Sequence, residues 1–420
     1  MQPPAVTFAR SVNLQIDQKT QTHNTPCSMK VTLISLITII SVLALALVAN
    51  SCKEQPNEVI VPPNESQRWE SIPEFALLSI RYMLQHNGTL YMSAVDPRVI
   101  RTIGHGDTLR FDGERGLIYK TTDGRTWTKV RGFDNEVGPM AMHGDTLYAL
   151  CSDTIFKMLP NGDWQRAIRT PGRMADASMV GDIVFYKDSL YAMQSLTQAL
   201  ETGIIYPDGS YRELFVRFTP TRSYQYAGSK FLKVIKNGIE TVFVRPRQGF
   251  SYLNGMFTFD GHLFHPLNEG LTDDERIYVP ANSMALKNDT LYAGFLNPSG
   301  IKRLVNDRWE AFKDTLPNWE HAFNVRPNLI TEPTAIAFAG ERMFVATHCL
   351  GVLEWRDSTG WQAMSEGLLK GFIPGIDNTN LYTPVVFLEH FKGVLFAGYG
   401  QPAYAPWGNE VFGIYRYEVK

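Results

Sequence analysis

The segment Gly144–Leu150, with the sequence Gly-Asp-Thr-Leu-Tyr-Ala-Leu, decides the fold because the chain repeats it. Lys187–Met193 and Asn288–Gly294 carry nearly the same residues, and four looser copies occur elsewhere. Each copy is predicted to be a tight turn followed by a β-strand. Gly, Asn and Asp adopt the positive φ of a hairpin turn, and aromatic and branched side chains suit a buried pleated surface. The aromatic residues of the copies are Tyr91, Tyr148, Tyr191, Phe243, Tyr292, Phe344 and Phe396.

The spacing of these aromatic residues predicts a β-propeller. They recur about every 50 residues, a period typical of propeller blades in a chain made of strands. Around each copy we expect an apolar strand before it, a third strand often opened by Gly, and a fourth strand that carries an aromatic residue. The sequence therefore predicts an all-β fold, a β-propeller of seven four-stranded blades.

The last repeat unit has no fourth strand of its own, since its third strand ends at Lys420. Residues 67–71, Gln-Arg-Trp-Glu-Ser, resemble fourth strands such as Asp-Arg-Trp-Glu at 307–310. We therefore expect the N-terminal strand to complete the last blade, which would remove an open sheet edge. This interpretation divides the chain into a leader with a signal peptide (1–51), a tether (52–66) and the propeller (67–420).

Residues 31–49 form the long apolar run of the chain and predict an exported protein. Lys30 precedes the run, and Ala49, Asn50 and Ser51 lead into Cys52. A basic start, an apolar stretch and small residues at its exit are the features of a secretory signal peptide. Either Met1 or Met29 fits the start of such a signal. A plain transmembrane anchor is the alternative, because the run is about long enough to span a bilayer.

The Cys that follows the small residues resembles the lipobox of bacterial lipoproteins. This resemblance implies lipidation at Cys52 and a membrane attachment through the lipid anchor. Lys53-Glu54-Gln55 directly after this Cys resembles the acidic export tag of surface-exposed lipoproteins in some Gram-negative bacteria. That resemblance implies a place in the cell envelope of a Gram-negative bacterium, as an outer-membrane lipoprotein that is periplasmic or surface-exposed. The net charge of −2 gives no basic footprint, so a nucleic-acid partner is not expected.

The sequence shows no motif for a cofactor, a metal ion or a nucleophile elbow. No cofactor and no metal site are therefore expected. Cys151 and Cys349 fall in the second and sixth repeat units, which are not neighbours in a ring of seven. A disulfide between them would be too long, so both are predicted to be buried free thiols.

Residues Thr121–Trp127, Thr-Thr-Asp-Gly-Arg-Thr-Trp, resemble the Asp-box of the sialidase-like, or BNR, propellers. That motif is Ser/Thr-x-Asp-x-Gly-x-Thr-Trp, and one residue is missing here between the Asp and the Trp. We expect Asp123 to accept backbone N–H bonds, Gly124 to adopt a left-handed φ, and Trp127 to pack between blades. In that family the Asp-box is structural and distant from the active site, so the resemblance implies a fold more than an activity.

Sialidases bind the substrate carboxylate with three arginines and use a Tyr–Glu nucleophile pair with an Asp acid/base. Their Arg-Ile-Pro near the first strand has its nearest match here in Ser71-Ile72-Pro73, with Ser in place of Arg. A carbohydrate-active enzyme, a glycoside hydrolase of sialidase-like type, is therefore an alternative function without assigned catalytic residues. A non-catalytic scaffold for envelope assembly is another.

Strand alternation places the loops of a propeller at two faces. The connections between second and third strands, and those between blades, share one face, which we name the long-loop face. The remaining turns share the other, which we name the hairpin-turn face. Long loops on a rigid scaffold usually carry binding residues, although aromatic side chains in them can also serve only to hold the loops in place.

The long loops are rich in Arg, Trp and Tyr, a composition typical of surfaces that recognise carbohydrates or proteins. The expected function is therefore an exported lipoprotein with a propeller module that binds a glycan or an envelope protein, rather than an enzyme. The candidate ligand-binding residues are Arg98, Arg101, Arg222, Tyr224, Arg247, Trp319, His321, Arg326, Tyr404 and Trp407.

Overall fold

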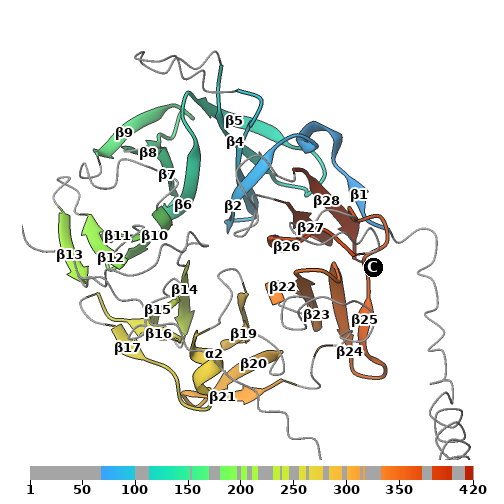
Figure 1. The fold of residues 1–420 in the computed structure, drawn as a ribbon. Helices are drawn as coiled ribbons and strands as arrows, with labels where there is room; N and C mark the ends of the chain where they lie inside the picture. The colour runs from blue at the N-terminus through green and yellow to red at the C-terminus, as the bar shows by residue number, and fades with distance from the viewer. Residues whose placement is uncertain are drawn as a thin grey trace, which may run out of the picture. The chain divides into compact units, whose positions relative to one another are not determined.

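The structure is a computed structural model of the chain. It describes residues 68–99, 113–151, 154–169, 180–195, 200–205, 211–215, 230–236, 239–245, 255–261, 264–277, 283–295, 300–312, 316, 333–370, 381–399 and 412–419. These residues form seven four-stranded antiparallel sheets. The sheets follow one another around a ring as the blades of a propeller (Figure 1). The prediction of an all-β propeller is confirmed.

The first strand of each blade lies nearest the middle of the ring (Figure 1). These first strands are β2 (Ser79–His86), β6 (Val137–His143), β10 (Val180–Tyr186), β14 (Lys230–Lys236), β18 (Met284–Lys287), β22 (Pro333–Ala339) and β26 (Phe387–Phe391). The second strands are β3 (Thr89–Val95), β7 (Thr146–Cys151), β11 (Ser189–Ser195), β15 (Ile239–Arg245), β19 (Thr290–Gly294), β23 (Arg342–Thr347) and β27 (Val394–Gly398). Each aromatic residue of the repeated segment lies in one of these second strands, as the spacing predicts.

The third strands are β4 (Gly116–Thr121), β8 (Thr154–Met158), β12 (Leu200–Ile205), β16 (Phe257–Phe259), β20 (Ile301–Val305), β24 (Val352–Arg356) and β28 (Ile414–Glu418). The fourth strands are β5 (Thr128–Phe133), β9 (Trp164–Arg169), β13 (Tyr211–Phe215), β17 (Phe264–Pro266), β21 (Arg308–Ala311), β25 (Gly360–Ala363) and β1 (Glu70–Ser71). Within the described ranges, two short helices lie outside the sheets, η1 (Pro73–Phe75) and α2 (Asp273–Ile277).

The turns between first and second strands have the chemistry that a two-residue hairpin requires. Asn87 and Gly88 have φ angles of 43° and 70°, and Asn288 and Asp289 have 48° and 59°. Gly, Asn and Asp tolerate two successive positive φ values best, and these values match the twist of the adjoining strands. Lys187 and Lys392 take the first turn position in two other hairpins, with φ angles of 46° and 48°. The repeated segment therefore fixes its own turn, and the turn fixes the register of the strand that follows.

The hydrophobic core lies between neighbouring blades. One cluster joins Leu150 and Ile155 of the second blade to Phe185 and Leu190 of the third. Each blade buries apolar side chains on both of its faces, and each large side chain removed from water contributes about 1.5–3 kcal/mol. Adjacent blades are therefore held together mainly by this burial.

The last blade is completed by the N-terminal strand, as predicted. Its sheet order is β1-β28-β27-β26, and the pairs Glu70↔Arg416 and Ser71↔Tyr415 join the two ends of the propeller. Ser71 thus belongs to the strand that closes the ring, and Ile72 and Pro73 directly follow it. The closure leaves the last blade with the same four strands as the others.

Trp69 occupies the same position in the last blade as Trp309 does in the fifth. The Trp309 indole N–H donates to the carbonyl of Leu267, with a nitrogen–oxygen distance of 2.7 Å, and the Trp69 indole N–H donates to the carbonyl of Met364. Each indole thus ties a fourth strand to the end of the preceding blade. A Cβ on Gly367 would lie 2.2 Å from the carbonyl oxygen of Trp69, so this close approach requires Gly.

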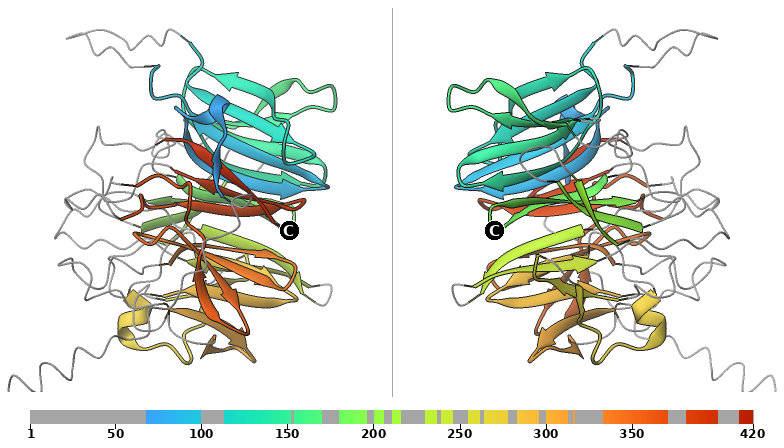
Figure 2. Two further views of the ribbon diagram at one scale, coloured as in Figure 1. Left: turned by 90° about the vertical axis from the view of Figure 1, so that its right-hand side faces the viewer. Right: turned by 90° about the vertical axis from the view of Figure 1, so that its left-hand side faces the viewer.

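The two faces of the propeller are distinguished in the edge-on views. Figure 2 shows α2 at one face and the C-terminus at the other. Helix α2 lies in the connection between the fourth and fifth blades and therefore marks the long-loop face. The Val419 N–H donates to the carbonyl of Gly393 over 2.8 Å, which places the C-terminal end beside a hairpin turn.

Successive blades also contact one another through their first hairpins. At the hairpin-turn face, Lys287 at the end of β18 forms an ion pair with Glu341 in the next blade, with a nitrogen–oxygen distance of 2.7 Å. His86 approaches Asp145 of the next blade in the same way, at 3.4 Å. Each exposed pair of this kind contributes little to stability. Together they bring the hairpin turns of neighbouring blades into contact.

No helix in the described part of the chain is long and apolar enough to span a bilayer. The apolar run at 31–49 and Cys52 lie outside the described residues.

Candidate functional site

Of the predicted ligand-binding residues, the structure describes Arg98. The others lie outside the described residues: Arg101, Arg222, Tyr224, Arg247, Trp319, His321, Arg326, Tyr404 and Trp407. The site can therefore be built from the side chains at the long-loop ends of the first two blades.

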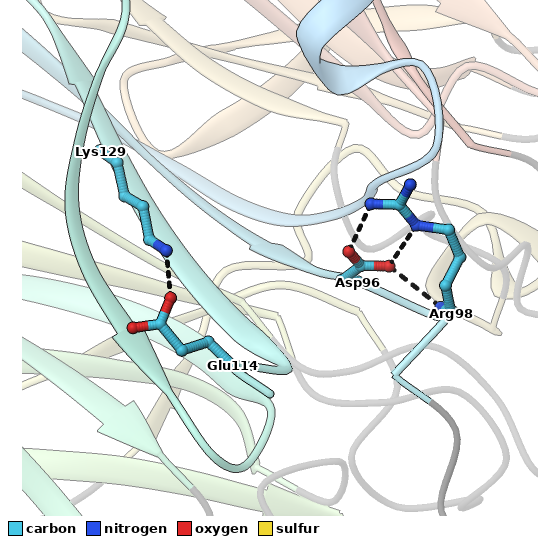
Figure 3. Close-up of polar contacts among 4 residues, drawn as sticks. All are labelled: Asp96, Arg98, Glu114 and Lys129. Atoms are coloured by element: carbon cyan, nitrogen blue, oxygen red, sulfur yellow. Dashed lines mark hydrogen bonds and ion pairs between the residues drawn. The ribbon is translucent and has the colours of Figure 1, made fainter. Parts of the chain in front are cut away.

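Asp96 follows the last residue of β3 and binds Arg98 in a fork (Figure 3). Its carboxylate accepts hydrogen bonds from Arg98 Nε over 2.9 Å and from Nη2 over 2.6 Å, and the Arg98 backbone N–H donates to it over 3.0 Å. These bonds hold the pKa of Asp96 below its usual value. The Arg98 side chain remains 62% exposed, so one edge of its guanidinium is occupied and the rest faces solvent.

Two further charged side chains pair across the outer part of the first blade. Figure 3 shows the Lys129 ammonium on β5 beside the carboxylate of Glu114, which lies shortly before β4. Both side chains are about half exposed, and their charges cancel. This pair therefore adds no net charge to the long-loop face.

A cluster that we did not predict from the sequence joins the first and second blades. Glu136, in the connection from β5 to β6, receives Arg115 Nη2 on one carboxylate oxygen and Arg81 Nη2 on the other. Arg115 directly precedes β4, where a Cβ on Gly116 would lie 2.3 Å from the carbonyl of Asn135. The glycine thus lets the two connections meet. We name Arg81, Glu136 and Arg115 the open cluster, because each side chain is about one-quarter exposed.

A similar set of side chains lies at the hairpin-turn end of the sixth blade. Arg342 Nε contacts one oxygen of Glu354 over 2.5 Å, and Arg356 Nη2 contacts the other over 2.7 Å. The Glu354 side chain is only 1% exposed, and the Arg342 guanidinium also lies over the ring of Phe344. We name Arg342, Glu354 and Arg356 the closed cluster after its buried carboxylate; the two arginine side chains are 30% and 50% exposed.

Asp182 on β10 is a buried carboxylate near the middle of the ring, and its contacts are structural. Its oxygens accept the backbone N–H groups of Ile183 over 2.9 Å and of Phe231 on the next blade over 2.8 Å. It also forms a side-chain hydrogen bond with Tyr82, whose pKa is raised by burial and by the negative charge of Asp182. Asp182 therefore joins three blades, and these contacts occupy it.

The turn that resembles an Asp-box has the predicted local geometry. Asp123 Oδ1 accepts the backbone N–H groups of Arg125 and Thr126, each over 2.8 Å, and these bonds lower the pKa of Asp123. Gly124 has a φ of 75°. Trp127 packs edge-on against Phe396 of the last blade, with 5.6 Å between ring centroids. The turn therefore acts structurally, on the hairpin-turn face.

Both cysteines in the described part of the chain, Cys151 and Cys349, are buried thiols that form no disulfide, as predicted. Next to Cys349, His348 is also buried, and burial lowers its pKa to about 4, so it is neutral near pH 7. Among the described residues, no group of three or more His, Cys, Asp and Glu side chains is placed to hold a metal ion.

Comparisons with known proteins show the following. No family model matches the chain, and no curated protein matches it. Sqt1 of Saccharomyces cerevisiae is 12% identical, with 80% of this chain and 83% of that chain covered and a TM-score of 0.43. The WD40 β-propeller domain of Doa1 is 10% identical, with 81% and 92% covered and a TM-score of 0.43.

A third similar structure is the PQQ-bound aldose sugar dehydrogenase of Streptomyces coelicolor. It is 10% identical, with 68% of this chain and 95% of that chain covered and a TM-score of 0.36. At these identities and TM-scores the likenesses carry no argument about function. The assignment of the propeller rests on the sheet order and strand pairing of the chain itself.

Proposed function

We propose that the protein is an exported, lipid-anchored binding module whose long-loop face recognises a glycan or a protein of the cell envelope. The observation that carries the proposal is the difference between the two faces. The hairpin turns contact one another from blade to blade, and the partly exposed arginines of the closed cluster each lie within 2.7 Å of Glu354. At the long-loop face, Arg81 of the open cluster reaches Glu136 only at 3.5 Å, and Arg98 leaves one edge of its guanidinium exposed. Exposed arginines on a rigid scaffold are typical of recognition surfaces.

Two of the described carboxylates, Asp96 and Asp182, favour a binding module over a glycoside hydrolase. A general acid near neutral pH needs a raised pKa, but the pKa of Asp96 is lowered by Arg98. Asp182 is occupied by backbone N–H groups of two blades. These residues suit hydrogen-bond acceptance and charge pairing better than proton transfer.

Two features support the proposed export to the cell envelope and the proposed relation to the sialidase-like propellers. The apolar run that ends at Cys52 supports export and lipidation. The turn at Asp123 supports an architectural relation to the sialidase-like propellers, since its carboxylate and Gly124 behave as that motif requires.

Capture of partners from solubilised cell envelopes tests the binding face, together with a glycan array. We expect Arg98→Ala, Trp319→Ala and Trp407→Ala each to weaken capture, with about 1–2 kcal/mol lost for an aromatic anchor. Arg308→Ala is the matched control, because Arg308 is also 62% exposed and pairs with one acid, Glu269. Capture that is insensitive to the three loop variants but lost in Arg308→Ala would contradict the proposal.

The anchor is tested separately on the same protein. Cys52→Ser should release the protein from the membrane fraction or leave its precursor unprocessed. Mass spectrometry of the wild-type protein should show a mature N-terminus at an acylated Cys52. An unmodified N-terminus at another residue would exclude the lipoprotein.

A further inference from the structure

Two exposed leucines lie at the long-loop end of the last blade. Among the described residues, three large apolar side chains are exposed: Leu77 (51%), Ile239 (69%) and Leu369 (36%). Leu77 lies in the connection from β1 to β2, and Leu369 lies in the connection from β25 to β26. Both connections join blades, so both leucines belong to the long-loop face. Ile239 pairs with Lys236 at the joined ends of β14 and β15 and therefore belongs to the hairpin-turn face.

Two tyrosines connect the two leucines into one region. The Leu369 backbone N–H donates to the Tyr399 hydroxyl over 3.1 Å, and the ring centroids of Tyr399 and Tyr415 are 5.4 Å apart. A Cβ on Gly413 would lie 3.8 Å from both the Tyr415 ring and the Cα of Ala76. Ala76 directly precedes the first leucine in the sequence, so the chain of contacts runs from one leucine to the other.

A lysine and a third tyrosine extend this region. The Lys370 ammonium lies 4.8 Å from the centroid of the Tyr382 ring, and the two residues form a β-bridge beside Leu369. Tyr382 and Tyr415 are half-buried and pack against the same apolar cluster that contains Tyr399. We name the exposed and half-buried members of the region the leucine patch: Leu77, Leu369, Lys370, Tyr382 and Tyr415.

The charges around the leucine patch cancel. The segments that carry it, 68–78, 364–370, 381–386 and 413–419, contain three basic and four acidic residues: Arg68, Lys370, Arg416, Glu70, Glu74, Glu366 and Glu418. Arg125 of the first blade pairs with the last of these acids over 2.8 Å and brings the sum to zero. A neutral patch with leucines at its two ends suits an apolar surface better than a highly charged partner.

The residue types of the patch are those of a protein at a bilayer interface. Leucine side chains enter the acyl region, and tyrosine places its ring at the level of the headgroups with its hydroxyl toward water. A lysine beside them can extend its ammonium group to the headgroups while its methylene chain covers apolar surface. The leucine patch contains all three types next to one another.

The blade that carries the patch is also the one joined most directly to Cys52. Arg68 leads into β1, the outermost strand of the last blade, and residues 53–67 separate it from Cys52 (Figure 1). The next connection along the chain contains Leu77. When a lipid on Cys52 is held in a bilayer, contact of this blade with the same bilayer becomes intramolecular, so a small patch is enough to bind it.

We propose that the leucine patch binds the surface of the lipid bilayer, with Leu77 and Leu369 inserted into its apolar region. This inference rests on the proposed function, because the lipid on Cys52 supplies the bilayer. It also deepens that function, since it turns the rim of the long-loop face toward the membrane. The partner that this face recognises then lies at the membrane surface.

The test uses the full lipidated chain in phosphatidylcholine vesicles. Leu77→Cys and Ile239→Cys each receive an environment-sensitive fluorophore, and the wild type, whose Cys151 and Cys349 are buried, is labelled in parallel as the blank. Lipids with a nitroxide on the acyl chain should quench the probe at position 77 by at least about twofold, because an inserted side chain reaches the acyl boundary. The probe at position 239, on the other face, is the matched control. No quenching at 77, or equal quenching at both positions, would overturn the assignment.

A charge introduced into the patch should remove the contact. Leu369→Glu should reduce the quenching at position 77 by at least about half, because an ionised carboxylate is costly in the acyl region. Ile239→Glu is the control and should leave this quenching unchanged. Thermal melting checks that each variant keeps its fold. Since the patch has no net charge, quenching should persist at high salt; quenching that needs anionic lipid and disappears in salt would contradict an apolar contact.

Flotation of the same vesicles separates this inference from the proposed anchor. Protein that floats with the vesicles through Cys52, but whose probe at position 77 is not quenched, would overturn the inference alone. Protein that never floats would contradict both the anchor and the inference. Envelope capture that is lost in Leu77→Glu, without quenching at position 77, would assign the patch to a protein partner in place of the bilayer.

Discussion

The open and closed clusters place the same three groups, two arginines and one glutamate, at opposite ends of the propeller. In the closed cluster, Glu354 is 1% exposed and both of its oxygens contact guanidiniums at 2.5–2.7 Å. In the open cluster, Glu136 is 25% exposed and its contact with Arg81 extends to 3.5 Å. The same residue types therefore form a short contact around a buried carboxylate in one region and a longer contact around a partly exposed carboxylate in the other.

The difference comes from where each glutamate lies. Glu354 is in the middle of β24 and is covered by the next blade, whose Tyr417 has a pKa raised by burial and influenced by all three charges. Glu136 is in a connection between blades at the long-loop face. A buried ion pair is costly to break, whereas a solvated one is not. The closed cluster should therefore matter for stability and the open cluster for binding.

The largest expected effect is that of Glu354→Gln. It leaves two partly exposed guanidiniums facing a neutral side chain that is itself buried, so we expect a loss of about 3 kcal/mol in the free energy of unfolding. Glu136→Gln should cost less than about 1 kcal/mol, because its partners can be hydrated. Urea unfolding followed by tryptophan fluorescence measures both values. Equal losses would remove the distinction between the two clusters.

The second effect concerns His348, a sealed group near the long-loop face. Its pKa falls from 6.5 to about 4 through burial, so the folded protein binds fewer protons between these values than the unfolded chain. The contribution of His348 to the free energy of unfolding is fully present above pH 6.5. As the pH falls toward 4, the free energy of unfolding decreases by about 3 kcal/mol because the unfolded chain binds the proton first.

Unfolding curves across this pH range should be flatter for His348→Gln than for the wild type. Glu136→Gln serves as the comparison, because it alters the open cluster without touching this histidine. If the free energy of unfolding changes with pH equally in His348→Gln and the wild type, His348 binds protons equally well in the folded and unfolded states, and this prediction is wrong. The result would also show how much of the long-loop end is sealed from water.

The smallest effect is that of Asp96→Asn, which removes the partner of an exposed arginine. We expect less than about 1 kcal/mol of destabilisation at pH 7. Because the pKa of Asp96 is lowered in the folded state, its contribution is present above pH 3.8 and is lost as the pH falls below that value. The melting temperatures of variant and wild type should therefore converge as the pH falls below 3.8. A constant difference between them would assign the effect to packing.

The architecture could be predicted from the sequence because its signals are local and repeated. Turns such as Asn87–Gly88 fix a hairpin by backbone conformation alone, and the recurring aromatic residues mark the second strand of every blade. Trp69 could be matched to Trp309 by its neighbours in the sequence, and that match predicted the closure of the ring. The local geometry around Asp123 followed from its turn residues for the same reason.

The open cluster could not be found in this way. Arg81 is set apart from the many other arginines only by a bulge in β2, and its partner Glu136 is brought to it by the pairing of whole blades. Loop composition led to Arg98, whose fork with Asp96 is local in sequence, but the rest of that prediction lies outside the described residues. The sequence thus determined strands, turns and ring closure, because backbone preferences and periodicity act over a few residues. The tertiary structure alone decided which charges meet and how well they are neutralised, because ion pairing depends on distances between segments that the chain brings together only on folding.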